Sequence, residues 1–162
     1  MLKILFVIIE LVLSTISFAS DKQTIYLVDF DPTNQELMAI PLNTIVNGAN
    51  GHKRAWVISV NKNKKIRYDL HEMFVDFNCA NSYVQGLQAH TYLKGQTIST
   101  FPGEKGGYAV PGTIGNIMYK FVCTFDENEP ASLAPFQQNF KDVSLNMVEM
   151  VAELQEFIQQ IN

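Results

Sequence analysis

The chain has 162 residues, of which 47% are hydrophobic, and its 16 acidic residues outnumber its 12 basic ones, for a formal net charge of −4. A composition this hydrophobic excludes an intrinsically disordered chain, and the length is sufficient for one domain with its own core. The acidic balance argues against nucleic acid as a partner.

Residues 1–19 have the pattern of a signal peptide. One lysine precedes an almost continuously apolar run at residues 4–16, and Ser17 and Ala19 place small side chains where signal peptidase requires them. A membrane anchor is the alternative, but the run is shorter than the roughly 18 to 20 residues that cross a bilayer, and Glu10 interrupts it. We expect an exported mature chain, periplasmic or secreted to the cell surface, with no stable membrane span.

The body of the chain contains two cysteines, Cys79 and Cys123. In an oxidising compartment an even pair of cysteines is normally a disulfide. There is no C-x-x-C motif, and nothing around either cysteine favours the lowered thiol pKa of a catalytic nucleophile. The sequence therefore predicts one structural disulfide.

Six segments have the alternation or the β-branched and aromatic composition that is typical of strands. The sequence predicts strands at residues 23–30, 37–45, 52–61, 66–78, 82–93 and 96–101. In the third segment Trp56, Ile58 and Val60 share one face, and in the fourth Glu72 and Phe74 do. These two segments form a hairpin.

Two helices follow. Thr113 is placed to cap a helix near residues 113–123, and an amphipathic pattern predicts a second helix near residues 143–161, capped by Asp142 or Ser144. The second helix packs on the sheet or, alternatively, mediates dimerisation or holds a partner.

The predicted fold is therefore α+β, with a single antiparallel sheet of about five to six strands packed with these two helices. We divide the mature chain into a disulfide-closed sheet domain at residues 20–125 and a tail at residues 126–162. An acidic linker that contains proline, residues 126–134, joins the two.

Half of the lysines and arginines fall in one short stretch that includes the tip of the predicted hairpin. A solvated hairpin explains this, and a patch for an anionic partner such as a glycan, a lipid headgroup or an acidic protein surface is the functional alternative. The candidate binding patch consists of Lys53, Arg54, Lys62, Lys64, Lys65 and Arg67.

Several short motifs together resemble a known family. They are a tryptophan-bearing strand, a cysteine that ends a long strand, a Tyr-Leu-Lys-Gly turn, a Pro-Gly-Thr helix start and a second cysteine, at residues 56–60, 78–81, 92–95, 111–113 and Cys123. This order resembles the surface-adhesin protein E family, small exported proteins of Gram-negative bacteria. The resemblance covers residues 24–123.

The resemblance implies an antiparallel sheet with a helix tied to it by a disulfide, and a role in binding. Protein E is a surface lipoprotein linked to the host matrix proteins vitronectin and laminin and to haem. This chain lacks the lipobox cysteine and has 39 residues after Cys123 that the pattern does not match. No ligand-binding residue can be carried over, because no matching motif is present.

No catalytic or metal-binding motif stands out. His52, His71 and His90 lack zinc-ligand spacing, the Gly-rich residues 103–107 are not a P-loop, and G-x-S-x-G and H-E-x-x-H are missing. We expect a non-enzymatic exported binding protein with no cofactor and with an unknown protein or anionic ligand as its partner. The alternatives are a periplasmic envelope-maintenance protein that acts as a homodimer, and an unrecognised hydrolase.

Overall fold

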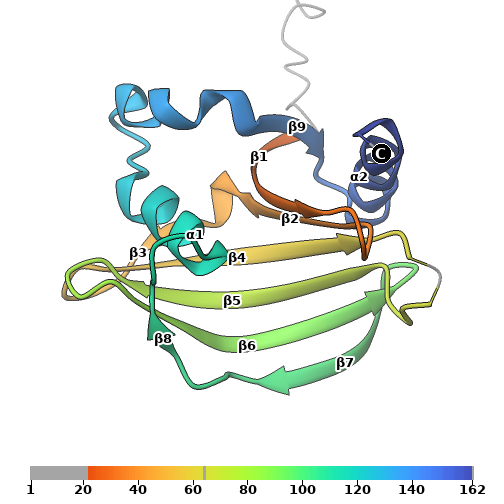
Figure 1. Cartoon of the computed structure of the whole chain (residues 1–162), viewed down its shortest axis with the longest axis horizontal. Coiled ribbons are helices and arrows are strands. Elements are labelled where there is room, and N and C mark those ends of the chain that lie inside the picture. Colours follow the sequence, from red (N-terminus) through yellow and green to blue (C-terminus); the bar gives the residue numbers. More distant parts are fainter. Residues whose placement is uncertain (1–21, 64, 162) are drawn as a thin grey trace, which may run out of the picture.

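The computed structural model describes residues 22–63 and 65–161, which form an α+β fold on a single antiparallel sheet (Figure 1). The fold class predicted from the sequence is confirmed. The predicted signal peptide, residues 1–19, and Lys64 lie outside the described residues. No helix in the described ranges combines the length and the apolar character that a membrane span requires.

The sheet runs in the order β7-β6-β5-β4-β2-β1-β9, with β3 paired to β4 and β8 paired to β6. Its nine described strands are β1 (Lys22–Asp31), β2 (Glu36–Pro41), β3 (Val46–Asn47), β4 (His52–Asn61), β5 (Leu70–Asn78), β6 (Tyr83–Leu93), β7 (Gln96–Pro102), β8 (Gly107–Tyr108) and β9 (Phe140–Ser144). Six of them correspond to the six strands predicted from the sequence. The other three, β3, β8 and β9, have five residues or fewer and carry little pattern of their own.

Two predicted strands are too long. The second ends at Pro41 and gives way to a 3-10 turn at Leu42–Thr44. The fourth begins at Leu70 rather than residue 66. In the loop before it, asparagine side chains accept hydrogen bonds from the backbone. Asn61 accepts a hydrogen bond from the backbone of Asn63, and Asn63 accepts one from Lys65. Such side-chain bonds to the backbone compete with strand pairing.

Helix α1 (Ile114–Thr124) covers one face of the sheet. Thr113 caps it as predicted, accepting a hydrogen bond from the backbone N–H of Asn116. Phe121 lies at the centre of the contact and stacks on Tyr26 of β1, with ring centroids 3.8 Å apart. A disulfide joins Cys123 to Cys79 just beyond the end of β5, so the helix is tied covalently to the sheet.

The tail after residue 125 completes the same core. A 3-10 segment, Pro130–Asn139, takes up residues 130–134 of the predicted linker, and its Phe136 packs against Tyr26 and Phe121. Strand β9 then pairs with β1 at the edge of the sheet. The sequence pattern missed both elements, because their apolar residues are few and too widely spaced to show a period.

Helix α2 (Met147–Ile161) starts later than predicted. Val143 belongs to β9 and pairs with Gln23, so the predicted helix start is wrong. The cap is Asn146, whose side chain accepts hydrogen bonds from the backbone of Val148 and Glu149. The helical period included Val143 because this residue is apolar and lies four residues before Met147. Its side chain is buried in the same cluster as the helix.

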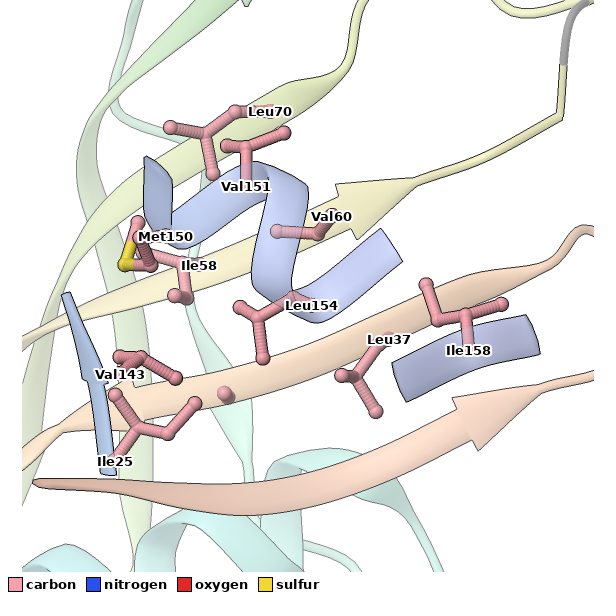
Figure 2. Close-up of a cluster of buried hydrophobic side chains, with 11 residues drawn as sticks. Ile25, Leu37, Ile58, Val60, Leu70, Val143, Met150, Val151, Leu154 and Ile158 are labelled. Atoms are coloured by element: carbon pink, nitrogen blue, oxygen red, sulfur yellow. The ribbon is translucent and has the colours of Figure 1, made fainter. Parts of the chain in front are cut away.

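The two helices lie on opposite faces of the sheet. Neighbouring strand residues point to opposite faces, and Ile25 joins the cluster under α2 while Tyr26 joins the cluster under α1. Figure 2 shows the α2 cluster, in which Met150, Val151, Leu154 and Ile158 meet side chains of β1, β2, β4 and β5. Strand β7 and most of β6 extend beyond both helices (Figure 1).

The disulfide should stabilise the fold because it restricts the conformations open to the unfolded chain. Replacing both cysteines by alanine is expected to lower the free energy of unfolding by about 4 kcal/mol, because the bond closes a long loop, 44 positions from Cys79 to Cys123. Urea denaturation of the two proteins measures the change. Reductant should weaken the native protein and leave the double variant unaffected; equal midpoints for all samples would contradict the prediction.

The packing of α2 on the sheet can be tested at one side chain. Leu154 is fully buried, so Leu154→Ala is expected to lower the free energy of unfolding by about 3 kcal/mol. Val148 on the same helix is 54% exposed, and Val148→Ala should change stability by less than about 0.5 kcal/mol. Thermal or urea unfolding checks both; equal effects would mean that the helix does not pack as described.

Candidate binding surface

The predicted basic patch is divided in the structure. Lys62, Lys65 and Arg67 lie in the loop between β4 and β5, while Lys53 and Arg54 lie at the other end of β4, about 30 Å away along the strand. Lys53 donates a hydrogen bond to the backbone carbonyl of Phe125. Arg54 pairs with Asp76. The loop cluster keeps its charges free of ion pairs within the described residues.

A different surface gathers polar and aromatic side chains. Beyond α2, the same face of β4, β5, β6 and β7 is not covered by a helix, and we call it the open face. The register of these strands places side chains of β4, β5 and β6 next to one another: Trp56 opposite Phe74 and Glu72 opposite His90. The open face is formed by Arg54, Trp56, Glu72, Phe74, Asp76, Gln85, His90 and Tyr92.

Aromatic rings run across the middle of the open face. The ring of Trp56 lies 5.1 Å from that of Phe74 and 5.8 Å from that of His90, and the rings of His90 and Tyr92 lie 6.4 Å apart, between centroids. All four side chains are only half-buried. Ring contacts of this kind fix the side chains relative to one another, so the surface is organised before any partner arrives.

Hydrogen bonds hold the polar members of this row in place. Tyr92 donates its hydroxyl to the carboxylate of Glu72. Burial, followed by this bond and the charge of Glu72, raises the pKa of Tyr92 to about 12, so the phenol remains a donor at neutral pH. On the other side of the row, His90 Nδ1 lies 3.0 Å from the hydroxyl of Thr100.

An ion-pair cluster lies at one end of the open face. Asp76 accepts hydrogen bonds from Arg54 Nε at 2.8 Å and from His52 Nδ1 at 2.5 Å. Burial by itself would raise the pKa of Asp76, but the two hydrogen bonds and the two positive partners outweigh burial and lower it. The carboxylate is therefore ionised and fully engaged, which fixes the orientation of Arg54.

A groove borders the open face where it meets α2. It has a volume of about 330 Å³. Its lining includes Trp56, Ile58 and Glu72 of the sheet, Leu145 of the turn before α2 and Met147, the first residue of α2. Leu145 is 51% exposed. The groove thus extends the aromatic row with an apolar wall, and it could hold a side chain of a partner.

One cluster on the other face has the residue types of a hydrolase site, but its serine is not hydrogen-bonded to its histidine. Ser59, Glu36 and His71 lie together there, but the serine hydroxyl donates to Glu36, and no described hydrogen bond joins it to His71. In a Ser-His pair the imidazole accepts the serine proton, and here the carboxylate of Glu36 holds that position instead. In the described ranges no three His, Cys, Asp or Glu side chains gather in a way that could hold a metal ion.

Sequence reasoning found the parts of the open face without recognising the surface. The alternation correctly placed Trp56 with Ile58 and Glu72 with Phe74 on one face. The available signal was the presence of a glutamate on an otherwise apolar and aromatic face, which argues against full coverage of that face.

Comparisons with protein-family models, with curated proteins and with solved structures find no match for this chain. The resemblance to the surface-adhesin protein E family therefore stays a prediction from the sequence.

Asp76 gives a pH-dependent test of the ion-pair cluster. Asp76→Asn is expected to lower the free energy of unfolding at pH 7 by about 1 to 2 kcal/mol, since a charged acceptor is lost. Because folding lowers the carboxyl pKa, the contribution is complete above its ordinary value of 3.8 and disappears as the pH falls through the lower folded value.

Urea unfolding at pH 7 and at progressively lower pH checks this expectation, with the exposed Glu127→Gln as the control. The difference between native protein and Asp76→Asn should shrink below pH 3.8. A difference that grows toward acid pH would show that the carboxylate is not stabilised in the folded state.

Proposed function

We propose that this chain is an exported, non-enzymatic binding protein that holds a protein partner on its open face. The observation that carries the proposal is the row of half-buried aromatic side chains Trp56, Phe74, His90 and Tyr92. Tyr92 packs against the edge of the α2 cluster, and the row continues from it onto the open face. Aromatic residues and arginine are the side chains that contribute most to protein–protein affinity. An aromatic centre with Arg54, Asp76 and Glu72 around it has the composition of such an interface.

Export is part of the proposal and is supported by the cysteine pair. The disulfide between Cys79 and Cys123 fits an oxidising compartment. The partner would then be a component of the envelope or of a host, as the resemblance to protein E implies. Whether it is reached in the periplasm or at the cell surface depends on the last step of export.

The alternative, an envelope protein that dimerises through its C-terminal helix, has less support. The apolar stripe of α2 is already buried against the sheet. What remains exposed on the helix is Val148 and Ile161 among glutamates and glutamines. Two copies of such an acidic face would repel each other.

In-cell cross-linking can test the open face while the partner is still unidentified. A photo-reactive amino acid at Gln85, an exposed position opposite Asp76, should give cross-linked adducts when the producing cells are irradiated. The matched control carries the same group at Gln159, an exposed position near the end of α2. Adducts that form only from position 85 would place the partner on the open face.

The same experiment is repeated with Trp56→Ala, and with Tyr108→Ala as the control, because Tyr108 is a 75% exposed aromatic residue outside the row. Loss of the central aromatic side chain is expected to weaken adduct formation at least tenfold, which corresponds to about 1.4 kcal/mol or more. Purified vitronectin and laminin serve as direct probes in parallel. Adducts that are equal for Trp56→Ala and Tyr108→Ala would rule out the open face as the interface.

A further inference from the structure

A second pocket lies on the opposite face of the same strands. It has a volume of about 240 Å³, and its lining includes His71 and Met73 of β5, Ala89 of β6, Phe101 and Pro102 of β7, and Glu104. The register sets Met73 opposite Ala89 and Ala89 opposite Phe101, so three neighbouring strands form one apolar floor. We call this cavity the His71 pocket.

Two glycines give the pocket its side wall. The backbone N–H of Glu104 donates to the carbonyl of Gly86 at 3.0 Å. A Cβ on Gly103 would come within 2.4 Å of that carbonyl oxygen, and a Cβ on Gly86 would come within 2.9 Å of the Met73 sulfur. Only glycine allows the loop to approach β6 this closely, and the approach holds Glu104 at the rim.

Three carboxylates act on His71 from the described part of the chain. Burial lowers the pKa of His71, and the charges of Glu36, Glu104 and Glu72 oppose this effect without cancelling it. The imidazole is therefore neutral at pH 7, and one of its ring nitrogens has a lone pair that can accept a hydrogen bond. Tyr68, whose ring lies 6.0 Å from His71, is also neutral, because burial and then Glu36 raise its pKa.

We propose that the His71 pocket binds a primary ammonium group carried on a short hydrocarbon chain. The chain lies on Met73, Ala89 and Phe101, and the ammonium group lies at the rim, between the Glu104 carboxylate and the imidazole of His71. An ammonium group has three donors and no acceptor, which matches a carboxylate beside a neutral imidazole. A carboxylate ligand would meet only like charge.

The size of the pocket limits the ligand. Its 240 Å³ is below the roughly 300 to 1,000 Å³ of sites for drug-sized molecules, so it suits an alkylamine or a single lysine side chain. A free alkylamine and a lysine side chain both present a primary ammonium group on a short hydrocarbon chain. The proposal does not depend on the open face, since Met73 and Phe74 are neighbours in β5 and point to opposite sides of the sheet.

The test is a titration of the purified mature protein with n-butylamine at pH 7.5, followed by NMR through the ring protons of the three histidines. His71 is expected to shift in a saturable manner, while His90, on the open face, serves as the internal control. n-Butanol has the same chain without charge, and butyrate has the opposite charge; both should bind at least about tenfold more weakly.

A separate titration with Nα-acetyl-lysine methylamide distinguishes a free alkylamine from a lysine side chain as the ligand. A site for lysine side chains should bind this compound more tightly than butylamine.

Glu104→Gln removes the rim charge at an exposed position and should weaken butylamine binding by about fivefold, as expected for a partly exposed ion pair. Glu156→Gln removes the same charge from an exposed position on α2, on the other side of the sheet, and should leave binding unchanged. The proposal is overturned if His71 shows no saturable shift with butylamine, if butyrate binds as tightly, or if the two variants behave alike.

Discussion

The burial of β1, β2 and β4 on both faces is the constraint on which the rest of this structure depends. Each of these strands contributes alternate side chains to two different clusters, so each face must be covered by something apolar. An α-helix is about 10 Å wide and strands lie about 4.8 Å apart, so one helix covers roughly two strands. Two helices on opposite faces therefore cover the strands on one side of the sheet and leave those on the other side bare.

The parts of β4, β5, β6 and β7 that lie beyond the helices carry the surfaces to which we assign function. On the α2 side they form the open face, with its aromatic row and its engaged carboxylates, Glu72 and Asp76. On the α1 side they form the His71 pocket, a cavity over β5, β6 and β7 that is closed on one side by the loop after β7. Both helices therefore pack toward the β9 edge of the sheet, one on each face, and leave the β7 end uncovered. The disulfide ties the shorter helix, α1, to the sheet in this arrangement.

Much of the fold could be read from the chain. The alternation of apolar and polar residues located six strands, and Thr113 located the start of α1. The misplaced elements have identifiable reasons. Val143 matches the helical period of α2 although it belongs to β9, because a cluster accepts an apolar side chain from either kind of element. The short strands β3 and β8 have two residues each, too few for any period to show.

For the candidate sites, the sequence by itself determined which side chains alternate on each strand and that two cysteines were available for a disulfide. Only the tertiary structure decided which faces remain uncovered, because coverage depends on which side of the sheet each helix packs. It also separated Lys53 and Arg54 from Lys62, Lys65 and Arg67, residues that are close in sequence but lie at opposite ends of one extended strand. The His71 pocket required the pairing of three strands and the close approach of Gly103 to β6, and neither leaves a local pattern in the chain.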